Sequence, residues 1–270
     1  MKLWKLACLS FLSLLLINCG SSSSSDNSKK TSETIVIDQS PDENLAIPDN
    51  TVVSSYQVLL IGNSHVASND LPALIERFIK LGKPNAKVSV ERLSNYNYLD
   101  NRINDGVTLE EIERKNWSHV VLQGQKYSQS KSVLYSTREA EKWIYLIKQR
   151  GITPILFPEH PQRGSTWEAQ YVHDIHLSIK NNQQSCVAPV GLGWNEVLSQ
   201  LPDLTLHAPD GNHAAYAGSV FTALVFYQVI TGELADALPY SDKIKLDNST
   251  QARLGEIASQ ILDEYQACDY

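Results

Sequence analysis

The sequence predicts one α/β domain in which a mainly parallel sheet lies between two layers of helices. From Tyr56 onward, short apolar runs rich in β-branched residues alternate with amphipathic helical patterns. This alternation is typical of consecutive βαβ units, which place parallel strands in one sheet and cover both of its faces. About 210 residues, from Tyr56 to Tyr265, are enough to bury one substantial core.

Five apolar runs are predicted to be strands, and the last is the weakest: residues 57–61, 87–92, 119–123, 153–157 and 187–190. Asn69 or Asp70 can cap a first helix that has Pro72 in its first turn and Gly82 past its end. Residues 108–111 and 136–139 both fit the capping box, in which Ser or Thr and Glu side chains bond backbone amides. Further helices are expected over residues 166–181, 214–230 and 249–265.

The N-terminal segment is expected to be an export signal. Lys2 and Lys5 precede an apolar stretch at residues 6–17 that is too short to span a membrane as a mature helix. Cys19 follows, with Gly20 and a serine tract, and this pattern resembles the lipobox of a bacterial lipoprotein, although Asn18 replaces the usual small residue. We expect residues 1–18 to be a lipoprotein signal peptide and Cys19 to carry acyl chains. An ordinary signal peptide cleaved elsewhere is the alternative.

Residues 19–55 are polar and show no periodicity, so we expect a flexible tether in front of a domain at residues 56–270. The protein is therefore expected to be exported and lipid-anchored to a bacterial membrane. Gly20, rather than an acidic residue, follows the cysteine and favours the outer membrane.

Charge and cysteine content limit the classes of partner. The formal net charge is −7 and no block of Lys or Arg is present, so nucleic acid is not an expected partner. The sequence has no CxxC pair or Cys/His cluster, and no metal site is expected. In an oxidising compartment Cys186 and Cys268 can form a disulfide that ties down the C-terminus, and two free thiols are the alternative.

A serine and a histidine far apart in the sequence each lie in a setting that a hydrolase needs. Ser64 follows the first apolar run through a Gly-Asn turn, at the end of a strand where ligands of parallel sheets bind. Asp210 and His213 share a Pro-Asp-Gly turn, so the carboxylate can accept from Nδ1 and leave Nε2 for the serine. Each motif alone is also common as a turn or a helix cap. Together they predict a nucleophile, its base and an acidic partner.

These segments resemble the SGNH (GDSL-like) hydrolase family over about residues 57–232. The nucleophile block reads IGNSH at residues 61–65, with Asn63 where Asp is commoner, and the Asp-x-x-His block reads DGNH at residues 210–213. The resemblance implies a flavodoxin-like three-layer α/β/α fold with a five-stranded sheet. It also implies ester hydrolysis by Ser64, His213 and Asp210 through an acyl-enzyme, with no metal or organic cofactor.

The resemblance implies oxyanion-hole donors as well, and here the chain departs from the family pattern. Besides the Ser64 amide, the family uses a glycine amide after the second strand, where this chain offers the amides of Ser94 and Asn95. After the third strand the family often has an asparagine, and Gln123, with Gln125 as alternative, is the expected donor here. A glutamine that only bonds neighbouring loops is the other interpretation. Loss of one donor costs about 3–4 kcal/mol of transition-state stabilisation.

We therefore expect a serine esterase acting on O-acetylated glycans or lipid esters, with the membrane as a partner through the lipid anchor. Two alternatives stay open. One is acyl transfer to a glycan hydroxyl, and the other is a catalytically weak, surface-anchored glycan-binding lipoprotein. His65, Glu159 and His160 are expected in loops or solvent, and Trp117 and Trp194 in the core or at its rim.

Overall fold

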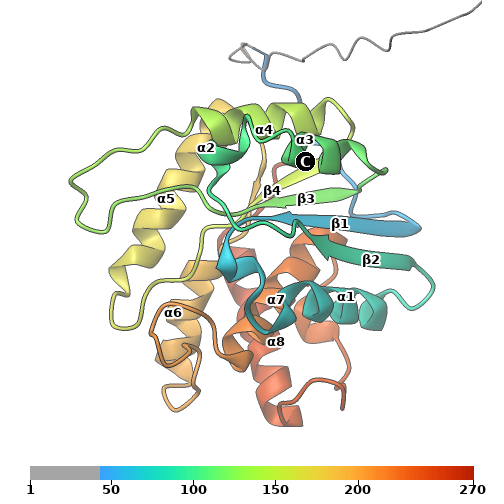
Figure 1. Cartoon of the computed structure of the whole chain (residues 1–270). Coiled ribbons are helices and arrows are strands. Elements are labelled where there is room, and N and C mark those ends of the chain that lie inside the picture. The colour runs from blue at the N-terminus through green and yellow to red at the C-terminus, as the bar shows by residue number, and fades with distance from the viewer. Residues whose placement is uncertain (1–42) are drawn as a thin grey trace, which may run out of the picture. The chain divides into compact units, whose positions relative to one another are not determined.

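Five parallel strands form one sheet in the computed structural model, which describes residues 43–270 (Figure 1). Across the sheet they run in the order β2 (Lys87–Arg92), β1 (Ser55–Ile61), β3 (His119–Leu122), β4 (Thr153–Leu156) and β5 (Cys186–Val187). The chain steps outward from β1 to β2 and then returns to add β3 on the other side of β1. The strand order therefore reverses at β1, and ligands bind at such a switch point in open parallel sheets.

Helices cover both faces of the sheet, as predicted. One face carries α1 (Leu71–Gly82), α6 (Val190–Gln200), α7 (Tyr216–Thr231) and α8 (Asn248–Glu264). The other carries α2 (Leu99–Arg102), α3 (Val107–Glu113) and α4 (Arg138–Lys148), and α5 (Trp167–Asn182) contributes to both cores. Short 3-10 turns lie at Ser64–Val66, Ser68–Asp70 and Ala235–Ala237. Alternate residues of β1 point to opposite faces, so Val58 and Leu60 enter one core and Leu59 and Ile61 the other.

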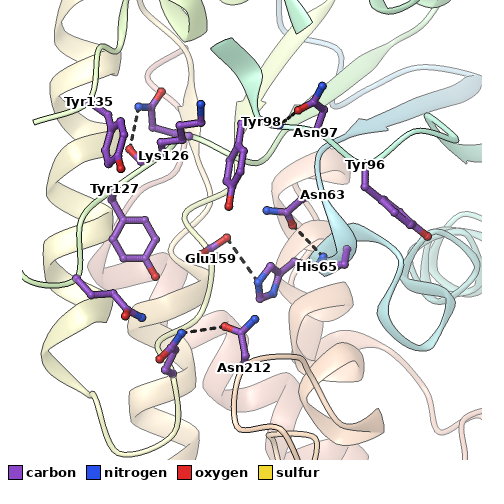
Figure 2. A pocket seen from close by; sticks show the side chains of 14 residues that line it. Asn63, His65, Tyr96, Asn97, Tyr98, Lys126, Tyr127, Tyr135, Glu159 and Asn212 are labelled. Carbon is purple, nitrogen blue, oxygen red and sulfur yellow. Dashed lines mark hydrogen bonds and ion pairs between the residues drawn. The ribbon is translucent and has the colours of Figure 1, made fainter. Parts of the chain in front are cut away.

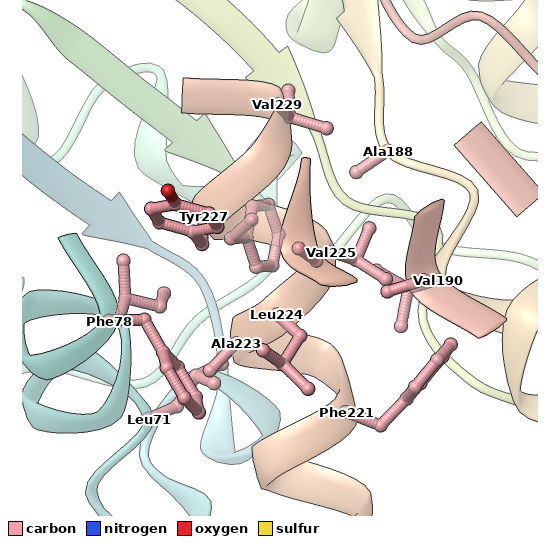
Figure 3. Close-up of a cluster of buried hydrophobic side chains, with 14 of the residues drawn as sticks. Leu71, Phe78, Ala188, Val190, Phe221, Ala223, Leu224, Val225, Tyr227 and Val229 are labelled. Carbon is pink, nitrogen blue, oxygen red and sulfur yellow. The ribbon is translucent and has the colours of Figure 1, made fainter. Parts of the chain in front are cut away.

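Helix α7 is buried along nearly its whole length, because it lies between the sheet, α1 and α8. Figure 3 shows its side chains packed against Leu71 and Phe78 of α1. Gly82 at the end of α1 lies so close to α7 that a Cβ there would be 2.1 Å from the Tyr227 hydroxyl. A small residue at this position therefore allows the two helices to approach.

The structure corrects the predicted helix starts. Asp70 precedes α1 in a left-handed conformation (φ 55°) without a side-chain cap. Thr108 does not cap its helix. The Asp105 carboxylate instead accepts from the Thr108 amide and hydroxyl at 2.8 and 2.9 Å. The capping box predicted that the Glu139 carboxylate accepts from a backbone amide. The carboxylate instead accepts from the Ser136 hydroxyl.

Helix α6 was not predicted. It begins at Val190, the last residue of the run expected to be a strand, whereas β5 has only two residues. The sequence of α6 contains Gly191 and Gly193, which lower its helix propensity. Both are needed because neighbouring atoms lie close: a Cβ at Gly193 would be 2.6 Å from the Phe221 ring.

The segment before β1 packs against the domain and is not free tether up to residue 55. Asn50 donates its side-chain amide to the carbonyls of Ser118 and Gly151, both at 3.0 Å. These carbonyls precede β3 and β4, so the segment lies at the amino ends of the strands, opposite their carboxyl ends. Lys148 donates to the Leu45 carbonyl at 2.6 Å, and Ile47 is buried. Residues 45–55 therefore belong to the folded domain.

The C-terminal segment lies beside the edge strand. Cys186 in β5 and Cys268 form a disulfide, and the Val187 amide donates to the Ala267 carbonyl at 2.8 Å. This contact covers part of the exposed edge of the sheet. The predicted signal peptide and Cys19 lie outside the described residues. Within residues 43–270 no helix is both long and apolar enough to cross a membrane.

Candidate active site

Ser64 lies directly beyond the carboxyl end of β1, in the first position of a 3-10 turn. Asn63 builds this turn: its side-chain oxygen accepts from the His65 amide at 3.0 Å and its carbonyl accepts from the Val66 amide at 3.3 Å. The Ser64 amide is the first N–H of the turn and has no acceptor inside it. The turn thus holds the hydroxyl and amide of Ser64 at the switch point of the sheet.

The loop before α7 brings His213 and Asp210 to Ser64. Ser64 Oγ lies 2.7 Å from His213 Nε2, and His213 Nδ1 lies 2.7 Å from Asp210 Oδ2. Asp210 Oδ1 also accepts from the amides of Asn212 and His213, at 2.9 and 3.0 Å. The carboxylate can accept only from a protonated Nδ1, which leaves the Nε2 lone pair for the serine hydroxyl. The predicted triad residues therefore form one continuous chain of hydrogen bonds.

Asp210 is held in its charged form. The hydrogen bonds from the His213 side chain and from the Asn212 and His213 amides keep the pKa of Asp210 well below its usual range. Asp210 therefore stays ionised wherever His213 can act as a base. The loop is itself braced, because the Ala208 amide donates to the His213 carbonyl at 2.8 Å.

A cavity of about 630 Å³ reaches Ser64 and His65 (Figure 2). Its walls come from the loops that follow the strands, which is the expected place for a site in this fold. Tyr96 and Tyr98 lie after β2, Tyr127 and Tyr135 after β3, and Glu159 after β4. Figure 2 shows the side chains of Tyr98, Tyr127 and Glu159 directed into the same space.

Gln123 is not positioned as the predicted oxyanion donor. Its side chain is fully buried and does not line the cavity. Its oxygen accepts from the Asn63 amide at 2.8 Å, and its nitrogen donates to Glu159 at 2.7 Å. Gln123 therefore joins two loops of the site, as in the alternative interpretation of this residue.

The other predicted donors are also engaged elsewhere or lie away from the cavity. Gln125 lines it, but its side-chain nitrogen donates to the carbonyls of Lys126 and Ser136 at 3.1 and 3.0 Å. Ser94 and Asn95 do not line it. The Asn95 carbonyl and side-chain oxygen accept from the buried Arg102, which also donates to the Gly62 carbonyl. Arg102 thus fixes the loop after β2 onto the loop that carries Ser64.

Asn97 is an amide side chain of this loop that does line the cavity. Its oxygen accepts from the Tyr98 amide and from the Asn101 side chain, both at 3.0 Å. These bonds orient the amide group and use only its oxygen. Asn97 was not predicted as a site residue, although it lies two residues beyond Asn95.

His65 and His160 are buried rather than exposed in loops. The His65 ring stacks on His213 with centroids 5.1 Å apart, and its Nε2 lies 3.8 Å from Glu159. His160 stacks on Trp194 at 3.8 Å and donates from Nε2 to the Asn212 carbonyl at 2.8 Å. Burial lowers the pKa of both His65 and His160. Neutral rings therefore support the loop that presents His213.

One sequence feature could have indicated that these histidines belong to the site. His65 and Glu159–His160 come shortly after the ends of predicted strands, where ligands bind in parallel sheets. No group of three His, Cys, Asp or Glu side chains in residues 43–270 is arranged to hold a metal ion.

The sequence matches no family model and no curated protein. Solved structures do match it. A candidate SGNH hydrolase from Slackia heliotrinireducens aligns with a TM-score of 0.52 and 19% identity, over 64% of this chain and 98% of that one. A DUF4886 family protein from Bacteroides uniformis aligns with a TM-score of 0.62 and 12% identity, over 78% of this chain and 96% of that one.

The chain therefore has the α/β/α fold of the SGNH hydrolases. This likeness confirms, at the level of the fold, the resemblance that the two sequence blocks indicated.

Proposed function

We propose that the protein is a serine esterase that hydrolyses acyl esters through an acyl-enzyme. The observation that carries this proposal is the chain of hydrogen bonds from Ser64 through His213 to Asp210, which opens into a cavity. Buried or purely structural serines do not need a histidine oriented by a carboxylate. Structural neighbours with the SGNH fold give further support.

In the proposed mechanism the Ser64 oxygen attacks the ester carbonyl carbon while its proton passes to His213 Nε2. The Ser64 amide is the candidate donor for the oxyanion that forms. When the tetrahedral intermediate collapses, the alcohol leaves with the proton from His213. Water then attacks the acyl-enzyme by the same route and releases the acid. Asp210 keeps Nδ1 protonated and stabilises the imidazolium.

An O-acetylated glycan or a lipid ester is the proposed substrate. Export and lipid anchoring at Cys19 are part of the same proposal, and they rest on the signal-like segment and the lipobox-like sequence.

Hydrolysis of p-nitrophenyl acetate, butyrate and octanoate by the full-length chain tests the mechanism. We expect kcat to fall by about 10³-fold or more in Ser64→Ala and His213→Ala, and by about 10³–10⁴-fold in Asp210→Asn, which keeps the oxygen acceptor but favours the wrong tautomer. Asp203→Asn, at an exposed position in the preceding loop, is the matched control. Undiminished turnover by Ser64→Ala would overturn the mechanism.

A fluorophosphonate probe provides a second test that does not depend on the choice of ester. The parent protein is expected to be labelled at Ser64, and Ser64→Ala is expected to remain unlabelled. A parent protein that is neither labelled nor active would instead support a binding protein on this scaffold.

A further inference from the structure

The residues that line the cavity distinguish between the two substrate classes. None of them has an aliphatic side chain, and every one carries a polar group. Burial of a fatty acyl chain is driven by apolar contact, worth about 0.8 kcal/mol for each methylene group. The exposed Leu134 lies next to Tyr135 but does not line the cavity. A long acyl chain would therefore find few apolar partners here.

Three of the four lining tyrosines are unusually exposed. Tyr96, Tyr98 and Tyr135 have exposed fractions of 53%, 43% and 44%, and all three border the same cavity. Large aromatic side chains gathered at one exposed site are typical of a binding surface. A tyrosine ring offers an apolar face for the C–H groups of a sugar ring, and its hydroxyl adds a hydrogen bond.

The remaining lining groups suit hydroxyl groups rather than charged ones. Glu159 is mostly buried, bonds Gln123, and keeps a carboxylate beside the cavity that can accept from a hydroxyl. Burial, together with the charges of Glu159 and Glu168, raises the pKa of Tyr127 well above its usual value, and its neutral hydroxyl bonds Glu159 at the cavity wall. Lys126 gives no free positive charge for a phosphate, because it is paired with Asp100 at 2.6 Å.

We infer that the cavity binds a carbohydrate, and that the substrate is a short-acyl ester, such as an O-acetyl group, on a sugar hydroxyl. This inference rests on the proposed esterase function and narrows it. The sugar ring would stack on the face of Tyr98 that Lys126 does not cover, while its hydroxyl groups bond Glu159 and the lining amides. The acetyl group would then reach Ser64.

Three substrates test the inference with the full-length chain: acetylated xylo-oligosaccharides, p-nitrophenyl acetate and p-nitrophenyl octanoate. We expect acetate release from the oligosaccharide to exceed octanoate hydrolysis in kcat/KM by about 100-fold or more. In Tyr98→Ala the ratio of kcat/KM for the oligosaccharide to that for p-nitrophenyl acetate should fall about tenfold, because stacking is lost. Tyr240→Ala, at an exposed tyrosine outside this cavity, should leave that ratio unchanged.

The outcomes separate the two proposals. If p-nitrophenyl octanoate is the best substrate, the carbohydrate inference is wrong and the serine esterase stands. If Tyr98→Ala and Tyr240→Ala give the same ratio as the parent, the tyrosine does not bind sugar, and the inference also fails. If no ester is turned over and the probe does not label Ser64, the esterase proposal itself falls.

Discussion

The side chain of Gln123 shows how a fully buried amide serves a site whose cavity it does not line. It spans the loops after β1 and β4, because it accepts from the Asn63 amide and donates to Glu159. Gly62 packs against the same side chain, and a Cβ at Gly62 would lie 2.4 Å from the Gln123 oxygen. Gln123 therefore fixes the position of the turn that carries Ser64.

Replacing Gln123 by Met, which has a similar length but no amide, should lower stability and turnover together. The Asn63 amide and Glu159 would each lose a partner in a largely buried place, which costs about 1–3 kcal/mol for each group. We expect kcat for p-nitrophenyl acetate to fall about tenfold, with a smaller change in KM, because the turn that positions Ser64 loosens. Urea unfolding and steady-state kinetics measure the two effects.

Gln184→Met is the matched control, since the side chain of Gln184 is exposed. A double-mutant cycle with Glu159→Gln adds a sharper check. The cost of Gln123→Met should be smaller when Glu159 is already a neutral amide, because an unpaired carboxylate is more costly to bury than an unpaired amide. Equal costs in both backgrounds would show that the charge of Glu159 contributes little to the Gln123–Glu159 bond.

The candidate triad was predictable from the sequence because each member sits in a short local motif. The oxyanion donors were not. Which amide faces the cavity depends on bonds between loops that are distant in the sequence. Arg102 holds the oxygens of Asn95, and the Asn63 amide and Glu159 hold the side chain of Gln123. No local pattern reports these bonds.

At the scale of elements, packing between α6 and α7 positions the loop that carries Asp210 and His213. Gly218 in the first turn of α7 lies against the Trp194 ring and the Leu206 carbonyl, where a Cβ would be 2.5 Å from each. Leu206 is paired with Ala215 through a 2.7 Å bond, at the base of this loop. Any shift of α7 away from Trp194 is therefore transmitted to the loop.

Gly218→Ala should consequently reduce both stability and kcat. The added methyl group meets backbone and a buried ring that has no room to move, and overpacking of this kind costs about 1–3 kcal/mol. Gly82→Ala is the comparison, because its clash with Tyr227 lies at the other end of α7. We expect thermal unfolding to shift in both variants but kcat to fall only in Gly218→Ala. Equal losses of kcat would indicate that the effect is not local to the loop.

Element types followed from periodicity, whereas element ends followed from contacts that the sequence does not show. The first four strands were predicted to within two residues, since their apolar runs are bounded by polar turns. The start of α3 was misplaced because Asp105, and not Thr108, supplies the capping oxygen. Helix α6 was missed because its glycines, required by the Phe221 ring and the Glu159 carbonyl, conceal its helical pattern.

At the scale of the molecule, the carboxyl and amino ends of the strands differ in function. The carboxyl ends of the strands hold the candidate triad and the cavity, and the amino ends are closed by the segment that includes Asn50. Composition predicted a tether up to residue 55, because this segment is polar. Its polar groups bond carbonyls before β3 and β4, a role that becomes visible only when the sheet is assembled.

The whole domain also buries several histidines in the neutral form. Burial lowers the pKa of His119 to about 3 and that of His176 to about 4, and it lowers the pKa of His173 as well. His119 is completely buried at the start of β3, and its Nε2 has no hydrogen-bond partner among the described residues. A proton on such a ring would be poorly solvated.

We therefore expect the free energy of unfolding to fall as the pH is lowered from about 6.5 to about 4.5. In this window the unfolded chain binds protons at its histidines, with ordinary pKa values near 6.5, while the folded chain leaves His119 and His176 neutral. Each such group steepens the dependence by up to about 1.4 kcal/mol per pH unit. Above about pH 6.5 both states are neutral at these positions and the full stability is present.

Urea unfolding at pH 7.5, 6.5, 5.5 and 4.5 measures this slope in the parent and in His119→Leu. His119→Leu removes one ring that binds a proton only in the unfolded state. The slope of the free energy of unfolding against pH should therefore be smaller by up to about 1.4 kcal/mol per pH unit. This holds even if the stability of the variant at pH 7.5 is lower. The Ser118 hydroxyl, which bonds His119 Nδ1 at 2.9 Å, keeps its bond to the Gln57 carbonyl. A parent whose stability is flat over this window, or a variant with the same slope, would show that the buried rings accept protons in the folded state.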